Sequence, residues 1–226
     1  MGYYSSYIVM IPFLIFTFYA QHKVKSTFKK YTQVRNRKGL SGAEVANMLI
    51  QRNGLTDVSV ERSNRGQLSD HYDPRSKTVR LSPEVYSGQS MSAVSVAAHE
   101  VGHAIQHAKA YAPLKFRSIL APAASFASRS VMFIVIGGFI FGITGLIDLG
   151  IIIFSIVILF QIVTLPVEFN ASSRALTQLE SQGIVYTDEI SDSKKVLNAA
   201  ALTYVAAAAA SVGHLIRLLI LRDRRG

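Results

Sequence analysis

The sequence predicts a mainly α-helical, multi-pass membrane protein that carries a small α+β domain. Half of its 226 residues are hydrophobic, a share that favours several membrane spans around a polar domain. Two long apolar runs, residues 3–20 and 131–165, supply the expected spans, and helical and strand-like patterns alternate between them. The chain has no cysteine, which excludes disulfides and Cys-type zinc sites and agrees with a domain facing a reducing cytosol.

The first apolar run is long enough to cross a bilayer with little tilt. Basic residues follow this run instead of preceding it, which is the opposite of a cleaved signal peptide. They are Lys23, Lys25, Lys29, Lys30, Arg35, Arg37 and Lys38. We therefore expect residues 1–21 to form an uncleaved anchor with its N-terminus outside and the basic segment in the cytosol. The net charge of +10 then indicates contact with anionic headgroups of the bilayer and no nucleic-acid partner.

Residues 22–130 contain the patterns of the α+β domain. Ser41 and Glu44 fit a capping box that opens a helix, and this helix is expected to end near Asn53-Gly54. Residues 57–61 and 77–81 alternate like short strands, which predicts a small antiparallel sheet. Residues 111–120 mix apolar and basic side chains and are expected to lie in the membrane interface, with prolines interrupting the chain around them.

A pair of histidines one helical turn apart lies inside this region. The segment His99-Glu100-Val101-Gly102-His103 matches the pattern H-E-x-x-H and is flanked by small and apolar residues, as in a buried helix. Histidines at positions i and i+4 lie on one helical face, where both imidazoles can bind one Zn²⁺. Glu100 could then accept a proton from a water that the zinc activates. The alternative is a core helix in which the histidines only pack.

The remaining histidines are poorer candidates for metal ligands. His107 continues the same helical face but lies about 12 Å from His99, too far for a straight helix to bring all three to one ion. The glycine turn with which metzincins solve this problem is absent. We expect His107 to pack or to support a ligand, and His71, in a polar turn, to be exposed. The third ligand must come from elsewhere in the chain.

The second apolar run, residues 131–165, predicts a transmembrane hairpin. As one helix it would be about 52 Å long, too long for a hydrocarbon core of about 30 Å. We expect two spans that turn around residues 145–150, with Asp148 in the turn on the outside. A new helix over residues 166–198 would then place Glu168 at the cytosolic surface, on the side of the histidine pair. This position makes Glu168 the candidate third ligand, the alternative being a plain surface carboxylate.

The C-terminal segment, residues 199–226, is apolar and rich in alanine. A fourth span would export Arg222, Arg224 and Arg225 against the positive-inside rule. The sequence leaves open whether this helix crosses the membrane or packs on the α+β domain.

The two motifs together resemble those of a known family. His99–His103 followed by Glu168-Phe169-Asn170-Ala171-Ser172 is similar to the gluzincin pattern of membrane peptidases. It looks most like the YugP-type zinc metallopeptidases of bacteria and, more remotely, like the HtpX and CAAX prenyl protease group. The likeness extends through residues 98–111, 164–176 and 197–207. It implies a zincin-like catalytic domain, a Zn²⁺ cofactor held by His99, His103 and Glu168, and peptide hydrolysis with Glu100 as general base.

The second motif departs from the remoter group at one position. There it runs Glu-x-x-Ala-Asp, and the Asp orients a ligand histidine; here Ser172 stands at that position, with Asn170 the nearest amide. Which residue orients His99 or His103 therefore stays open. Tyr204, His214 and Arg174 are candidates for donating a hydrogen bond to the oxyanion, and one of the expected strands is a candidate for pairing with an extended substrate.

The expected substrates are membrane proteins or juxtamembrane segments, because Glu168 directly follows a span. The expected location is the cell membrane, with the catalytic domain on the cytoplasmic side. A regulatory membrane partner is possible, but the sequence does not identify one. The alternative function is a membrane adaptor that keeps the zincin fold with little hydrolysis, to which Ser172 gives some support. A zinc transporter is disfavoured because the expected spans carry almost no ionisable groups.

Overall fold

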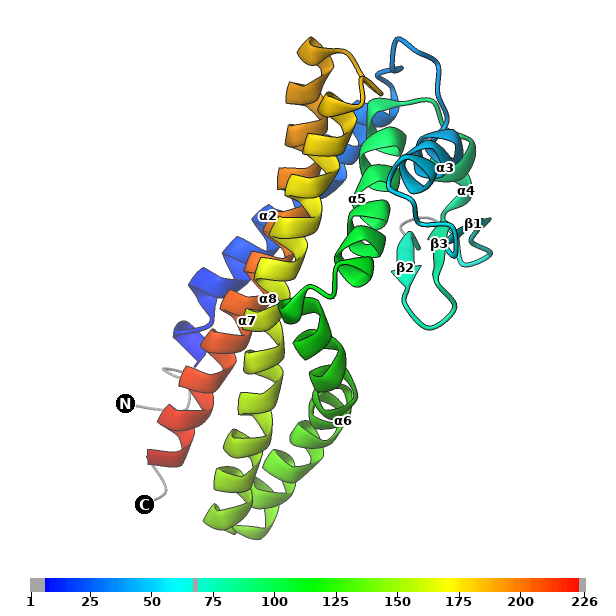
Figure 1. Cartoon of the computed structure of the whole chain (residues 1–226). Helices are drawn as coiled ribbons and strands as arrows, with labels where there is room; N and C mark the ends of the chain where they lie inside the picture. The colour runs from blue at the N-terminus through cyan, green and yellow to red at the C-terminus, as the bar shows by residue number, and fades with distance from the viewer. Residues whose placement is uncertain (1–6, 67–68, 224–226) are drawn as a thin grey trace. The chain divides into compact units, whose positions relative to one another are not determined.

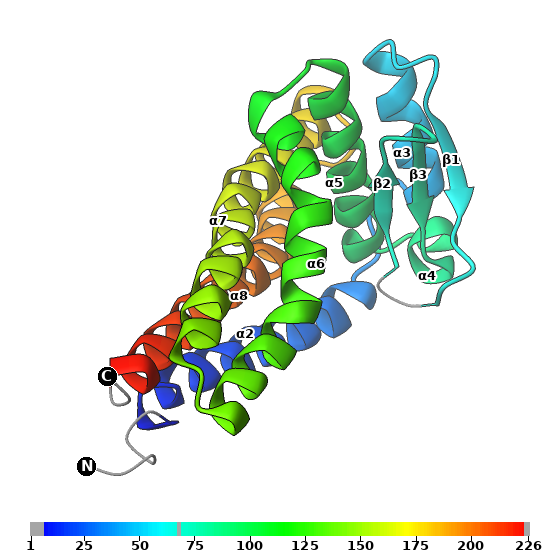
Figure 2. The same cartoon turned by 90° about the horizontal axis from the view of Figure 1, so that it is seen from below.

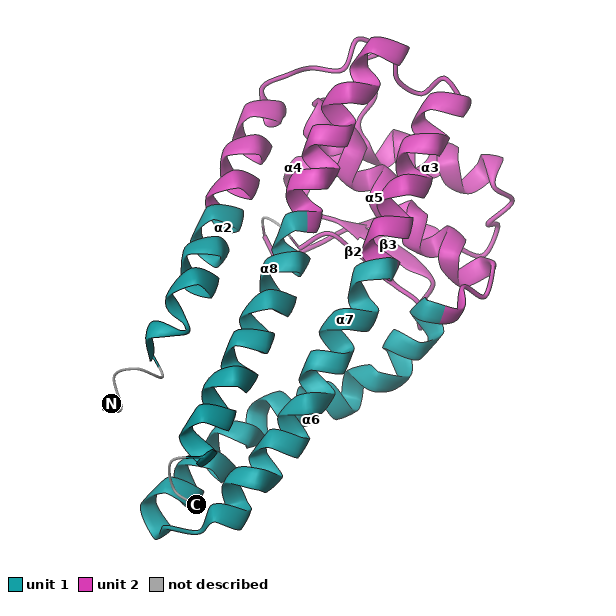
Figure 3. Ribbon diagram, turned by 90° about the vertical axis from the view of Figure 1, so that its left-hand side faces the viewer, with its two compact units in different colours: residues 1–21, 113–166, 202–226 teal, residues 22–112, 167–201 magenta. Residues whose placement is uncertain are grey.

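The computed structural model describes residues 7–66 and 69–223 and confirms a mainly helical chain with a small sheet (Figure 1). The chain divides into two compact units (Figure 3). The helical unit consists of residues 1–21, 113–166 and 202–226, and the site unit of residues 22–112 and 167–201. The start of the expected N-terminal anchor, and Arg224 and Arg225 of the C-terminal segment, lie outside the described residues.

Within residues 7–66 and 69–223, three helices are long and apolar enough to cross a membrane. They are α6 (Ala112–Phe141), α7 (Thr144–Ser181) and α8 (Ile190–Asp223), the last preceded by the 3₁₀ turn η1 (Thr187–Glu189). Only 17–22% of the residues in the most apolar window of each helix are buried, which leaves a large apolar surface that lipid can cover. The C-terminal segment is thus a candidate span by length and composition.

The helical hairpin turns earlier than the sequence predicts. Helices α6 and α7 are joined by Gly142 and Ile143, whereas residues 145–150 lie inside α7. Gly142 has a φ of +69°, a left-handed conformation that glycine adopts without steric cost. Asp148 is therefore helical rather than part of a turn, and its Oδ1 lies 2.7 Å from Nε of Arg222 on α8.

Prolines do not interrupt the helices in the way the sequence suggests. The sequence predicts that prolines interrupt the chain around residues 111–120. In the structure Pro122 lies inside α6, and this helix continues to Phe141. The helix expected to start at Pro166 is instead the continuation of α7. In apolar surroundings the stabilisation from continued helical hydrogen bonds exceeds the cost of the one bond that a proline removes. Helices in such surroundings therefore tolerate proline.

The expected N-terminal anchor is only partly described. From Ile11 onward it belongs to α2 (Ile11–Thr32), which is not among the three candidate spans found in the described residues. The anchor therefore stays a prediction.

The site unit contains a mixed three-stranded sheet in the order β1-β3-β2 (Figure 2). The strands are β1 (Ser59–Arg62), β2 (His71–Asp73) and β3 (Thr78–Leu81). The two predicted strands, β1 and β3, pair in parallel, so the antiparallel prediction is wrong for them. The reason is β2, which lies between them in sequence and pairs antiparallel with the other side of β3. A strand of three residues is too short for its alternation to be recognised.

Three further helices surround the core of the site unit. They are α3 (Gly42–Arg52), α4 (Pro83–Ser87) and α5 (Met91–Ala108). The capping box of Ser41 and Glu44 at the start of α3 is confirmed, as is the end of that helix at Asn53-Gly54. Apolar residues of α3, β3, α5, α7 and α8 form one buried cluster, which includes Leu49, Leu81, Val94, Leu179 and Leu197. This cluster fixes the back of α5, the helix that carries H-E-x-x-H.

Candidate metal centre

Helix α5 presents two histidines on one face. It begins after Ser90, whose side chain accepts a hydrogen bond from the backbone N–H of Ala93, a favourable N-cap. The ring centroids of His99 and His103 lie 4.8 Å apart in an edge-to-face arrangement. The predicted helix over this motif is confirmed, and with it the side-by-side placement of the two imidazoles.

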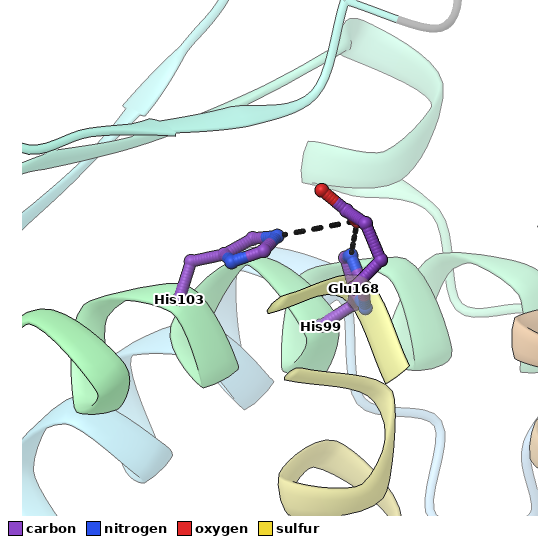
Figure 4. A group of neighbouring side chains, drawn as sticks. All are labelled: His99, His103 and Glu168. Atoms are coloured by element: carbon purple, nitrogen blue, oxygen red, sulfur yellow. Dashed lines mark ion pairs between the residues drawn. The ribbon is translucent and has the colours of Figure 1, made fainter. Parts of the chain in front are cut away.

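Glu168 completes a group of three potential metal ligands (Figure 4). Its Oε2 lies 3.3 Å from Nε2 of His99 and 3.6 Å from Nε2 of His103. These separations exceed the usual N–H···O distance, but they match the edge of a zinc tetrahedron, about 3.4 Å for ligand bonds of about 2.1 Å. All three ligand atoms lie within 4.8 Å of one another. The donor set and its spacing therefore fit Zn²⁺.

A glycine lets the two site segments approach closely. A Cβ on Gly102 would lie 2.6 Å from the carbonyl oxygen of Ala171 in α7, which is closer than any real Cβ contact. The H-E-x-x-H helix and the Glu168 segment thus touch through their backbones. This contact places Glu168 opposite the two histidines.

Each of the two candidate ligand histidines has an uncharged partner at Nδ1. The hydroxyl of Ser172 lies 3.2 Å from Nδ1 of His99, and Oε1 of Gln106 lies 3.0 Å from Nδ1 of His103. Ser172 thus takes the place expected of an Asp, whereas Asn170 contacts Gln106 rather than a histidine. Gln106 was not anticipated from the sequence, although its position three residues after His103, on the same helical face, is a recognisable signal.

Glu100, the expected general base, is 8% exposed. The charge of Glu100 also affects the pKa of a second carboxyl group, that of Asp70. Burial raises the pKa of Asp70 and the charge of Glu100 adds to this, although hydrogen bonds from the backbone N–H and hydroxyl of Ser82 act in the opposite direction. Asp70 was not anticipated from the sequence, because the loop before β2 has no recognisable motif.

His71 and His107 do not join the cluster. Among the described residues, the one group of three or more His, Asp or Glu side chains with converging ligand atoms is His99, His103 and Glu168. His71 lies on β2, where its Nδ1 is 2.7 Å from the carbonyl oxygen of Ser69. Nδ1 of His107 is 2.8 Å from the hydroxyl of Tyr72. Burial raises the pKa of Tyr72 to about 12, so this phenol keeps its proton at neutral pH.

The three candidates for an oxyanion donor have different surroundings. Nε of Arg174 donates to Oδ1 of Asn170 at 2.7 Å, and its guanidinium carbon lies 6.0 Å from the ring centre of Tyr111. Tyr204 and His214 belong to the helical unit, where His214 packs edge-on against Phe154. A role in oxyanion stabilisation stays a prediction for all three.

Acidic pH should weaken zinc binding at this site. Burial alone lowers the pKa of His103, but the neighbouring carboxylates of Glu168 and Glu100 outweigh burial and raise it. A raised pKa means that the metal-free site holds a proton to above pH 6.5, and zinc must displace that proton. We expect the apparent zinc affinity to fall at least about tenfold per pH unit below the pKa, measured by chelator competition.

The raised pKa of His103 also affects the stability of the metal-free protein. Protonated His103 stabilises the fold fully below the unfolded pKa of about 6.5, and this stabilisation is lost as the pH rises through the folded pKa. The melting temperature of the metal-free protein should therefore fall across that interval. Zinc affinity that is constant between about pH 5.5 and 7.5 would contradict the proton competition.

Comparison with known proteins agrees with this geometry. The model of a family described as "Putative neutral zinc metallopeptidase" matches residues 6–223. The chain is also 50% identical over 205 residues to the "Putative membrane protease YugP" of Bacillus subtilis (strain 168), covering 91% of each chain. No solved structure matches the chain. The chain therefore belongs to this family of neutral zinc metallopeptidases, whose cofactor is Zn²⁺.

Proposed function

We propose that the chain is an integral membrane endopeptidase in which His99, His103 and Glu168 hold Zn²⁺ and Glu100 is the general base. The observation that carries this proposal is the convergence of the three ligand atoms within 4.8 Å, at separations typical of a zinc tetrahedron. Three protein ligands leave a fourth position open, which is the arrangement of catalytic rather than structural zinc sites.

The chain's own residues have separate roles in this mechanism. Bound zinc would supply a Lewis acid that polarises the scissile carbonyl and acidifies a water. Glu100, beside His99 on α5, accepts the proton of that water and passes it to the leaving amine. Ser172 and Gln106 hold the outer nitrogens of the two histidines, so that the inner nitrogens face Glu168. Ser172 contacts His99 at the position where the remoter group has an Asp, which favours the enzyme over the adaptor alternative.

Membrane-associated substrates fit the sequence position of the site. Glu168 lies three residues beyond the apolar run that ends at Leu165, within one turn of the same helix. An edge strand is also available, since β2 ends the sheet and Tyr72 contacts His107 on α5. An extended peptide can add to such an edge. Reconstituted protein should cleave a peptide with an attached span faster than the same peptide without it; the reverse order would contradict this substrate class.

The ligand assignment is tested by Glu168→Gln in full-length protein reconstituted into nanodiscs. Loss of a ligand should cost more than loss of a partner behind a ligand, so we expect zinc affinity to fall by more than about 100-fold. Glu180→Gln is the matched control, because Glu180 is exposed on the same helix. Chelator competition gives the affinity, and anomalous scattering at the zinc edge gives the ligands. Unchanged zinc affinity in Glu168→Gln would refute the assignment.

A further inference from the structure

Gln106 is a buried polar residue that the mechanism has so far used only as a neighbour of His103. Its side chain has no exposed surface, so an unsatisfied amide there would be costly. Its amide makes three hydrogen bonds. Oε1 meets Nδ1 of His103 at 3.0 Å, and Nε2 meets the carbonyl oxygen of Val167 at 2.8 Å and Oδ1 of Asn170 at 3.0 Å.

The direction of every hydrogen bond in this network follows from Arg174. A guanidinium can only donate, so Asn170 must present its oxygen to Nε of Arg174. That oxygen also faces Gln106, which must therefore present its NH₂ group. The carbonyl of Val167, which can only accept, demands the same orientation of Gln106.

The orientation of Gln106 fixes the protonation form of His103. With its NH₂ group turned to Asn170 and Val167, Gln106 presents its oxygen to His103. An amide oxygen only accepts, so Nδ1 of His103 must carry the proton. In the neutral ring this leaves the lone pair on Nε2, the atom that lies 3.6 Å from Glu168. The imidazole is thus set in the form that binds a metal through Nε2.

The same amide connects two ligands that are distant in sequence. Val167 directly precedes Glu168, and His103 lies one turn before Gln106 on α5. A single side chain therefore contacts His103 itself and the backbone next to Glu168. His99 differs, because its Nδ1 faces the hydroxyl of Ser172, which can donate or accept. Of the two histidines, only His103 therefore has the position of its ring proton fixed by its hydrogen-bond partner.

We infer that Gln106 is a positioning residue, which holds His103 in its Nδ1-protonated form and fixes the spacing between His103 and Glu168. This inference rests on the proposed function, because it assigns both residues to zinc. It predicts that Gln106 affects metal binding without contacting the metal.

The test compares three variants in full-length protein in nanodiscs. Gln106→Leu keeps the volume but removes all three hydrogen bonds, so zinc affinity should fall about 10- to 100-fold. Gln106→Glu keeps an acceptor for Nδ1 of His103 but sets an oxygen against the carbonyl oxygen of Val167 and Oδ1 of Asn170. It should therefore keep the Nδ1 proton of His103 while zinc affinity still falls. Gln178→Leu is the matched control: Gln178 also joins two elements, through Asn53 after α3, but lies outside the site. Its zinc affinity should stay within about twofold of the parent.

A second readout separates positioning from general packing. The hydrogen-bonded Nδ1 proton of His103 should be visible by ¹H–¹⁵N NMR in the zinc-loaded parent and in Gln106→Glu, but lost in Gln106→Leu. If Gln106→Leu does not fold, Gln106→Glu decides, because loss of the Nδ1 proton of His103 in this folded variant would overturn the inference.

Comparison with Glu168→Gln distinguishes the two possible failures. If Glu168→Gln loses zinc but Gln106→Leu binds it as the parent does, the inference about Gln106 is wrong and the zinc site stands. If both variants bind zinc as the parent does, the proposed site itself is wrong.

Discussion

Glu100→Gln is expected to lower the rate of peptide hydrolysis by about 10²- to 10⁴-fold, the usual contribution of a general base. The amide has nearly the same shape as the carboxylate but cannot accept the proton of the attacking water. Zinc affinity should remain close to that of the parent, because Glu100 is not one of the three converging ligands. Hydrolysis of a reconstituted peptide substrate and zinc content, measured on the same sample, check both parts.

The control for this variant is Glu61→Gln. Glu61 lies on β1 and pairs with Arg80, so its neutralisation changes a charge in the same unit without touching the candidate site. Activity should then be unchanged. Parent-like hydrolysis by zinc-loaded Glu100→Gln would remove the general base from the mechanism and leave the adaptor alternative to be examined.

Gly102→Ala is expected to damage both stability and zinc binding. The added Cβ would lie 2.6 Å from the carbonyl oxygen of Ala171, so the two backbones must separate. Overpacking of this kind costs about 1–3 kcal/mol. Because Ala171 lies three residues after Glu168, the separation should also weaken zinc binding, by about 10-fold or more. Thermal unfolding and chelator competition measure the two effects.

Gly145→Ala provides the matched comparison. Gly145 also lies in a helix, but a Cβ there meets no atom within 4 Å. An alanine in a helix avoids the conformational cost of glycine, so this variant should be as stable as the parent or slightly more stable. Equal behaviour of the two alanine variants would mean that the backbone contact at Gly102 is unimportant.

The parts of this protein that could be predicted are those encoded by local spacing. The i, i+4 histidines identify the α5 helix and the face on which both imidazoles lie, and Ser41 with Glu44 identifies the start of α3. Apolar length identifies the candidate spans, because hydrophobic runs need no tertiary contact to be recognised. The match of Glu168 to a second motif identified it as the candidate third ligand before its position was known.

The parts that could not be predicted depend on contacts between distant segments. Parallel pairing of β1 with β3 is set by the three-residue strand β2, which leaves almost no pattern in the sequence. The course of the chain at Pro166 depends on surroundings that favour helical hydrogen bonding. The role of Gln106 depends on Val167 and Asn170, which reach it only after folding.

The separation of the ligands along the chain affects biosynthesis. His99 and His103 are made early, whereas Glu168 follows only after α6 and the apolar part of α7 have been synthesised. A nascent chain that ends before Glu168 holds two imidazoles and lacks the carboxylate that completes the proposed centre. On the proposed assignment, the centre therefore cannot be completed during synthesis before the apolar residues of α6 and α7 have been made.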